Sequence, residues 1–70
     1  MTYQVHKLES GRYAIAGWSE YHQQWQSPDV DGDVSTVYGY AGRIERIPAL
    51  RTYAHRSSAR RRMRALLLID

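Results

Sequence analysis

Arginine is the residue type in this chain with the clearest capacity for chemistry. Nine of the ten basic residues are arginine, and eight of these fall within residues 43–70, where only Glu45 and Asp70 are acidic. Residues 1–42 carry five acids against Lys7 and Arg12. The planar guanidinium group binds phosphates, carboxylates and base edges well. The concentration of arginine in the second half of the chain therefore predicts a binding surface for an anionic partner.

The arginines cluster on a predicted helix over residues 58–69, capped by Ser57 or Ser58. At 100° per residue, Ala59, Met63, Leu66 and Leu67 form an apolar stripe that can pack on a sheet. Arg60, Arg61 and Arg64 form a basic stripe, and Arg62 stands alone. Cations near a helix N-terminus oppose its dipole, which suggests that these arginines serve a partner. A solvated face and an acidic protein surface stay open as alternatives. The candidate nucleic-acid or partner-binding residues in this basic half of the chain are Arg51, Tyr53, Arg56, Arg60, Arg61 and Arg64.

The aromatic residues are six tyrosines and two tryptophans, with no phenylalanine. Both types have a polar group and are common at interfaces. Tyr21 and Trp25, flanked by glutamines beside an acidic loop, are the predicted exposed contacts. Five of the others are expected to fill a small core with their hydroxyl groups at its rim: Tyr3, Tyr13, Trp18, Tyr38 and Tyr53.

The remaining polar residues predict neither a metal site nor catalysis. Asp29, Asp31 and Asp33 alternate, but a calcium loop starting at Asp29 would need glycine where Val34 stands and glutamate where Tyr40 stands. We interpret this loop as a turn with solubilising charge, directed away from DNA or lying within a protein contact. The histidines, His6, His22 and His55, lack metal-ligand spacing, and the chain has no cysteine. We expect no enzyme activity and no cofactor.

Strands predicted over residues 2–55 must position the helix. Residues 2–18 predict a hairpin turning at Ser10-Gly11, in which Glu9 pairs with Arg12 and Tyr3 with Trp18. Residues 19–26 fit either a short helical turn or a continued strand, and 27–33 a loop. Further strands are expected at 34–40, 43–47 and 49–55, with a turn at Ala41-Gly42. The prediction is a single α+β domain over residues 1–70. It has an antiparallel sheet of three to five strands and one C-terminal amphipathic helix.

The stretch RTYAHRSSARRRMRALL, residues 51–67, resembles the last strand and helix of the N-terminal arm-site DNA-binding domain of phage-type tyrosine integrases. SGRYAIAGW, residues 10–18, is similar to the opening strand of that family. The resemblance implies a three-stranded sheet that enters the major groove, backed by the helix. The longer segment WSEYHQQWQSPDVDGDV departs from the tight hairpin of the family. In size and arginine content the chain also resembles small phage-encoded inhibitors of host machinery, including anti-CRISPR proteins.

These observations predict a non-enzymatic nucleic-acid-binding module, with double-stranded DNA as the expected partner. The alternative is a small inhibitor that binds a protein through tryptophan, tyrosine and arginine. No apolar run is long enough to cross a membrane, and no signal-peptide pattern opens the chain, so a cytoplasmic protein is expected. Leu68 and Ile69 lie off the apolar stripe, which leaves a homodimer and a frayed terminus equally open.

Overall fold

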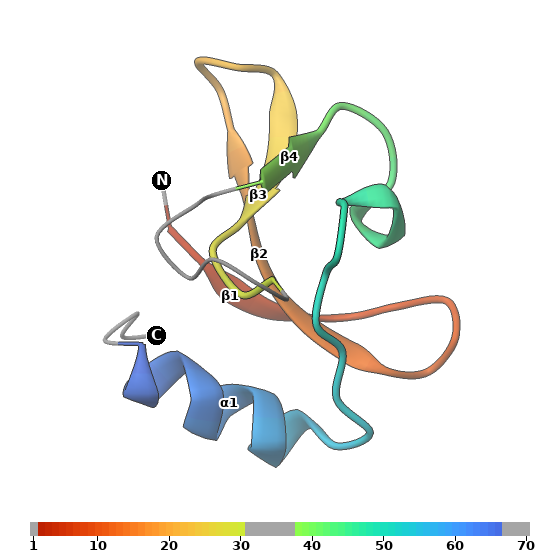
Figure 1. Cartoon of the computed structure of the whole chain (residues 1–70), viewed down its shortest axis with the longest axis vertical. Helices are drawn as coiled ribbons and strands as arrows, with labels where there is room; N and C mark the ends of the chain where they lie inside the picture. Colours follow the sequence, from red (N-terminus) through yellow and green to blue (C-terminus); the bar gives the residue numbers. More distant parts are fainter. Residues whose placement is uncertain (1, 31–37, 67–70) are drawn as a thin grey trace.

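The computed structural model describes residues 2–30 and 38–66, which form a four-stranded antiparallel sheet and one long helix (Figure 1). The strands are β1 (Gln4–Lys7), β2 (Tyr13–Ser19), β3 (Gln24–Ser27) and β4 (Tyr38–Tyr40), and they lie in the sheet in that order. A short 3₁₀ helix, η1 (Ile44–Arg46), and α1 (Arg56–Ala65) follow. The predicted α+β class and the C-terminal helix are confirmed.

The β1–β2 hairpin forms as predicted, but one residue away from the predicted register. Val5 lies opposite Ile15 and Lys7 opposite Tyr13. The loop has three residues rather than two, because Leu8 N–H donates to the Arg12 carbonyl at 2.7 Å and Gly11 N–H donates to the Leu8 carbonyl at 3.0 Å. Gly11 takes the left-handed conformation that such loops require, with φ +88°. The predicted Glu9–Arg12 and Tyr3–Trp18 pairs are therefore wrong.

The segment left open at residues 19–26 is a second hairpin. β2 continues to Ser19, residues 20–23 turn, and the chain reverses into β3. Ser19 Oγ accepts a hydrogen bond from His22 N–H at 3.1 Å, and the Gln23 side chain donates to the Glu20 carbonyl at 2.7 Å. Gln23 supplies the positive φ of +52° that closes the turn. Neither alternative anticipated the reversal.

The two strands predicted after β4 are wrong. Residues 44–46 form η1 because Ile44 and Ile47, three positions apart, both pack against the core, and a strand would send them to opposite faces. Ala49, with φ +57°, turns the chain again. Among the residues that the structure describes, residues 49–55 then pair with other segments only at Leu50, opposite Val30, and Tyr53, opposite Tyr13. Of the predicted strand at 34–40, residues 38–40 are confirmed, and 34–37 lie outside the described residues.

α1 begins earlier than predicted. Its N-cap is His55, which makes no side-chain capping bond, so Ser57 and Ser58 lie within the first turn rather than capping it. The helix ends at Ala65, and the predicted positions Leu67, Leu68 and Ile69 lie outside the described residues.

The two faces of β2 supply the two parts of the core. Ala16 packs with Val30 and Ile47, against Trp25, Ile44 and Leu50. Ile15 points the other way, as does Tyr13, whose ring contacts Arg56 of α1. The face bearing Ile15 is therefore the one that α1 covers, with Ala59 and Met63 as its buried residues. Of the tyrosines and tryptophans expected in the core, none whose burial is described is fully buried: Tyr3, Tyr13 and Tyr53 are half-buried and Trp18 is exposed.

Candidate nucleic-acid interface

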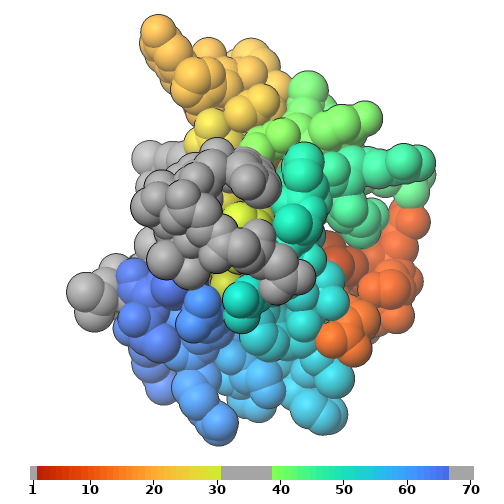
Figure 2. Space-filling view, in the orientation of Figure 1, coloured from red at the N-terminus to blue at the C-terminus, as the bar shows by residue number. Residues whose placement is uncertain are grey.

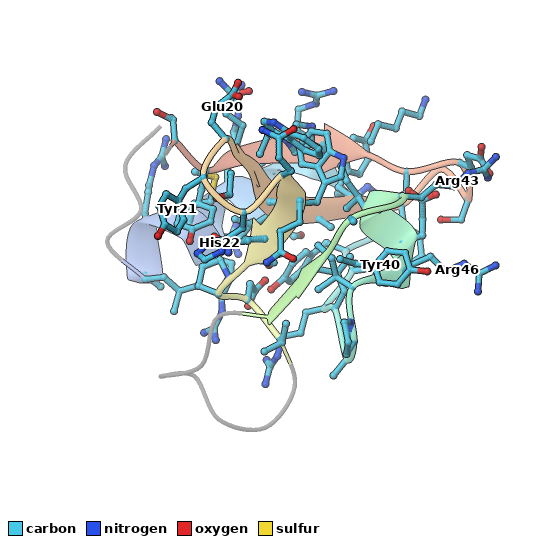
Figure 3. The ribbon with its side chains drawn as sticks, turned by 90° about the horizontal axis from the view of Figure 1, so that it is seen from above. Glu20, Tyr21, His22, Tyr40, Arg43 and Arg46 are labelled. Atoms are coloured by element: carbon cyan, nitrogen blue, oxygen red, sulfur yellow. The ribbon has the colours of Figure 1, made fainter. Side chains whose placement is uncertain are left out.

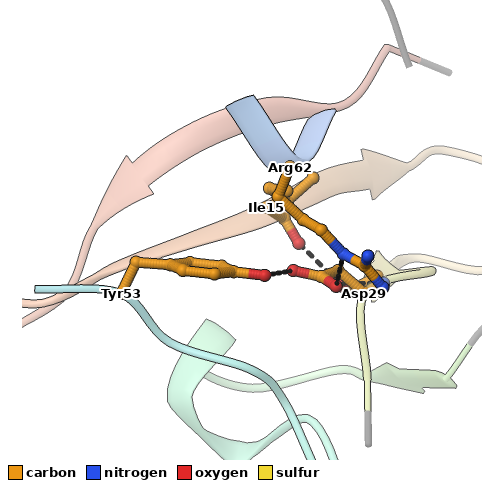
Figure 4. Close-up of polar contacts among 5 residues, drawn as sticks. Ile15, Asp29, Tyr53 and Arg62 are labelled. Carbon is orange, nitrogen blue, oxygen red and sulfur yellow. Dashed lines mark hydrogen bonds and ion pairs between the residues drawn. The ribbon is translucent and has the colours of Figure 1, made fainter. Parts of the chain in front are cut away.

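The arginines of α1 divide into two groups. Four are exposed, and from here on they are called the outer arginines: Arg56, Arg60, Arg61 and Arg64. Arg62 is half-buried and turns toward the sheet, where its Nε donates to Asp29 Oδ1 at 3.1 Å (Figure 4). The helical spacing predicted that Arg62 stands apart from the basic stripe. The structure agrees, because Arg62 contacts Asp29 while the outer arginines face solvent.

Asp29 is the most consequential difference from the sequence interpretation. It was expected in a solubilising turn, and its side chain is 0% exposed. Ser27 fixes this segment: its hydroxyl donates to the Ile15 carbonyl at 2.5 Å and accepts the Asp29 N–H at 3.1 Å. The Asp29 carbonyl accepts the N–H of Arg51 at 3.1 Å. A carboxylate this deep requires a partner, which Arg62 supplies. Asp31 and Asp33 lie outside the described residues.

Tyr53 completes the buried polar cluster of Asp29, Arg62 and Tyr53. Its hydroxyl donates to Asp29 Oδ2 at 2.5 Å (Figure 4). Burial raises the pKa of Tyr53 above its ordinary value, and the hydrogen bond to the Asp29 carboxylate raises it further. The phenol therefore remains a proton donor to Asp29. Tyr53, within this cluster, and Arg51, beside it, were both predicted to bind a partner, and both are half-buried.

Arg56 lies over the ring of Tyr13, with its guanidinium carbon 5.2 Å from the ring centre. Tyr13 pairs directly with Lys7 of β1, so Lys7 shares the sheet face that α1 covers. Lys7 is exposed. Sequence reasoning missed this lysine because it lies in the acidic half of the chain. The correct hairpin register would have placed it beside Tyr13.

Arg60 and Arg61, neighbours in the predicted stripe, face different surroundings. Arg60 lines a cavity of about 250 Å³ with Arg56, Gln4 and Val5, between α1 and β1. Arg61 lines a separate cavity of about 290 Å³ with Tyr53 and Arg62 on the opposite flank of the helix. The 100° step between successive helical residues explains the separation.

Tyr21 and Trp25 do not join the outer arginines. The β2–β3 turn projects from the end of the molecule opposite α1, as Figures 1 and 2 show. Tyr21, in this turn, is 91% exposed, and its ring packs edge-on against His22 at 4.8 Å (Figure 3). Trp25 is half-buried, with Trp18 at 5.5 Å and His6 at 5.1 Å from its ring.

The strand register reveals an aromatic row that the spacing did not predict. Trp25 lies opposite Trp18 on one side and Tyr40 on the other, so the three rings share one face of the sheet. Trp18 is 37% exposed and Tyr40 44%. Gly42 makes room for the Tyr40 ring, since a β-carbon there would lie 2.6 Å from it. Only the pairing of three strands brings these residues together.

A second group of charged residues surrounds Tyr40. Arg43 and Arg46 flank a cavity of about 640 Å³ with Tyr40, Glu9 and Glu45. Figure 3 shows Tyr40, Arg43 and Arg46 away from Glu20, Tyr21 and His22. Arg43 pairs with Glu9 at 2.8 Å, and both side chains are about 70% exposed. Acids and arginines line this cavity in equal number, so it attracts an anion less than the outer arginines do.

Across residues 2–30 and 38–66, the structure shows no group of three side chains suited to holding a metal ion. In the same residues no helix is long and apolar enough to span a membrane. Comparison with models of protein families, with curated proteins and with solved structures finds no match to this chain.

Proposed function

We propose that this protein is a non-enzymatic nucleic-acid-binding module that contacts the phosphates of double-stranded DNA through the outer arginines. One observation carries the proposal: four arginines of a ten-residue helix face solvent, and the helix contains no acid. Phosphate neutralisation by such residues supplies most of the affinity of non-specific DNA binding.

The energetics of α1 support a role for these charges outside the fold. Arginines in the first turns of a helix oppose its dipole, and Arg56, Arg60 and Arg64 repeat at the i, i+4 spacing at which like charges repel. Arg62 already neutralises the buried Asp29. The outer arginines are therefore an electrostatic cost to the helix, which a polyanionic partner would offset.

A gel-shift titration of a 16-base-pair duplex across salt concentrations tests the proposal. Four phosphate contacts predict a slope of log K against log salt of about −3.6, so affinity falls roughly 10²-fold between 50 and 200 mM salt. The variant Arg60→Gln/Arg61→Gln/Arg64→Gln should lose most binding. The control Arg43→Gln/Arg46→Gln removes two charges at the Tyr40 cavity and should lose little compared with Arg61→Gln/Arg64→Gln, which also removes two. Absence of binding to duplex or single strand at about 50 mM salt would refute the proposal.

A second candidate function, a protein-binding inhibitor, is favoured by the aromatic residues at the other end of the molecule. Tyr21 stands almost fully exposed on a projecting turn, and Trp18 and Tyr40 lie open on the sheet. Tyrosine, tryptophan and arginine dominate binding hot spots. Capture of a partner from nuclease-treated lysate, lost in Tyr21→Ser but kept in Arg61→Gln, would support this function over DNA binding. Asp29 cannot probe such a surface, because it is buried.

A further inference from the structure

The cavity between β1 and α1 has the composition of an anion site. It measures about 250 Å³, and Arg56, Arg60, Gln4 and Val5 line it. This volume lies below the 300–1,000 Å³ typical of pockets for drug-sized ligands. No acid is among the described residues that line it, whereas Glu9 and Glu45 line the larger cavity beside Tyr40. The smaller cavity is therefore the better site for a compact anion.

The helix places the two arginines of this cavity on one side, and a ring contact orients one of them. Arg56 and Arg60 are one helical turn apart and so lie on the same side of α1. The Tyr13 ring lies beneath Arg56, which favours one position of that flexible side chain through a cation–π contact. Lys7, opposite Tyr13 in the sheet, adds a third positive charge nearby.

The edge strand adds a backbone donor to the cavity. Leu8 N–H bonds to the Arg12 carbonyl, so in the alternating antiparallel pattern residues 8, 6 and 4 bond across to β2. The N–H of Val5 then points away from β2, along the open edge of the sheet. Because Val5 lines the cavity beside Arg56 and Arg60, this N–H can serve the same anion.

We propose that the β1–α1 cavity binds one backbone phosphate of the nucleic acid, held by Arg56 and Arg60 together and assisted by the Val5 N–H. Two forked guanidinium groups match the several acceptor oxygens of a tetrahedral phosphate, and such paired contacts are strong and directional. The proposal rests on the proposed function for the source of the phosphate. It adds that two of the outer arginines share a single phosphate rather than contacting two, which changes the expected salt slope from about −3.6 to about −2.7.

A double-mutant cycle on the 16-base-pair duplex tests this sharing. Arg56→Gln and Arg60→Gln should each weaken binding about 10-fold, as expected for a charged hydrogen bond. The double variant should weaken binding far less than 100-fold. The magnitude of its slope of log K against log salt should decrease by about 0.9, which corresponds to one phosphate contact. In the control pair Arg60→Gln/Arg61→Gln, on opposite flanks of the helix, the two losses of binding free energy should add. The magnitude of the slope should then decrease by about 1.8. Additive losses for Arg56 and Arg60 would overturn the proposal while leaving DNA binding established.

Inorganic phosphate tests the site without DNA. In a titration followed by NMR, with chloride as the ionic-strength control, phosphate should shift the Nε–H signals of Arg56 and Arg60 and the amide of Val5. It should leave the Nε–H of Arg61 unshifted. If phosphate caused these shifts but the protein bound no duplex, the cavity would still be a phosphate site and the proposed function would be refuted. Equal shifts at all three arginines would refute the site.

Tyr13 separates positioning from charge. Tyr13→Phe retains the aromatic face under Arg56 and should bind duplex as the unmodified protein does. Tyr13→Leu removes that face without changing any charge and should weaken binding several-fold when Arg56 is present, but not once Arg56 is glutamine. A loss in Tyr13→Leu that persists in the Arg56→Gln background would show that Tyr13 acts through the fold alone, against the proposal.

Discussion

The two sides of α1 use the same residue type in opposite ways. On the inner side, Arg62 is bound to a carboxylate that has no contact with solvent. On the outer side, Arg60 and Arg61, which directly precede it in sequence, are exposed. The inner arginine stabilises the fold because a buried charge is costly without its partner. The outer arginines oppose the helix dipole and repel one another, and the anionic partner that we propose would offset this cost.

This difference shows that an arginine count is not a measure of a binding surface. Arg62 contributes as much to the net charge as Arg61 does, yet Asp29 cancels it at short range. Its loss should change the stability of the protein, and the loss of Arg61 should change its affinity for a partner. Variants of neighbouring residues on α1 can therefore separate folding from binding.

The largest effect on stability is expected from Arg62→Met, which leaves the Asp29 carboxylate buried without its cation. Removing one member of a buried ion pair costs about 3–5 kcal/mol, a large part of the stability of a small domain. Asp29→Asn should cost less, because Arg62 is 29% exposed and can be hydrated. Urea unfolding at pH 7 measures both variants.

The double variant Asp29→Asn/Arg62→Met sharpens this result. Since it removes both charges, it should be more stable than Arg62→Met alone. Arg61→Gln, which changes the adjacent exposed arginine, is the matched control and should unfold within about 0.5 kcal/mol of the unmodified protein. If Arg62→Met and Arg61→Gln had the same stability, the distinction between the two sides of α1 would be lost.

A smaller loss, of about 1–2 kcal/mol, is expected from Tyr53→Phe, because it removes a hydrogen bond to a charged acceptor. The pH dependence identifies this bond. The pKa of Tyr53 is higher in the folded state than in the unfolded chain, so above pH ~10 the unfolded chain loses this proton first. Because the unfolded state then binds fewer protons, a rise in pH lowers its free energy relative to that of the folded state. Stability should therefore fall as the pH rises above ~10.

Burial also raises the pKa of Tyr3, so the unmodified protein alone does not isolate Tyr53. Comparing the stability of the unmodified protein with that of Tyr53→Phe, each at pH 8 and pH 11, isolates the contribution of Tyr53. The alkaline loss should be smaller in Tyr53→Phe than in the unmodified protein. An identical loss in both would mean that the Tyr53 hydroxyl does not stabilise the folded state through Asp29.

Much of the secondary structure followed from local sequence. Alternating strand formers around Ser10-Gly11 predicted the first hairpin, and the spacing of Ala59 and Met63 predicted the buried side of α1, both of which the structure bears out. These features depend on side-chain periodicity within one segment. The register prediction was wrong because the loop has three residues, closed by the hydrogen bond from Gly11 N–H to the Leu8 carbonyl, and one more loop residue shifts every cross-strand pair by one position.

The candidate site was harder to predict, since it depends on contacts between distant segments. Asp29 was interpreted as a surface residue because aspartate beside proline and glycine usually marks a loop. Its burial requires Arg62, 33 positions away, and Tyr53, 24 positions away. Likewise Lys7 and the Trp18–Trp25–Tyr40 row emerge only from strand pairing. The isolated position of Arg62 on the helical wheel was the one local signal of the buried cluster.

Substitution on the outer side of α1 should raise the stability of the protein, whereas Arg62→Met on the inner side should lower it. Arg61→Gln removes an exposed cation from the middle of the helix and relieves repulsion with Arg64, three residues further on. We expect a gain in stability of about 0.3–0.5 kcal/mol at low salt, declining as salt screens the charges. Thermal unfolding at 20 and 300 mM salt measures it. A loss of stability at both salt concentrations would place Arg61 among the residues that the fold requires.

The smallest effect is expected at the exposed ion pair of Arg43 and Glu9, which provides the surface counterpart of Asp29–Arg62. The two pairs have similar distances, 2.8 and 3.1 Å, but the Glu9 side chain is 71% exposed and that of Asp29 is 0% exposed. Water and salt weaken an exposed pair, and ordering two long side chains opposes it, so Glu9→Gln should change stability by less than about 0.5 kcal/mol. Urea unfolding beside Asp29→Asn gives the comparison under one set of conditions. If Glu9→Gln proved as destabilising as Asp29→Asn, burial would not be the reason for the strength of the inner pair, because distance and charge type are nearly the same in both.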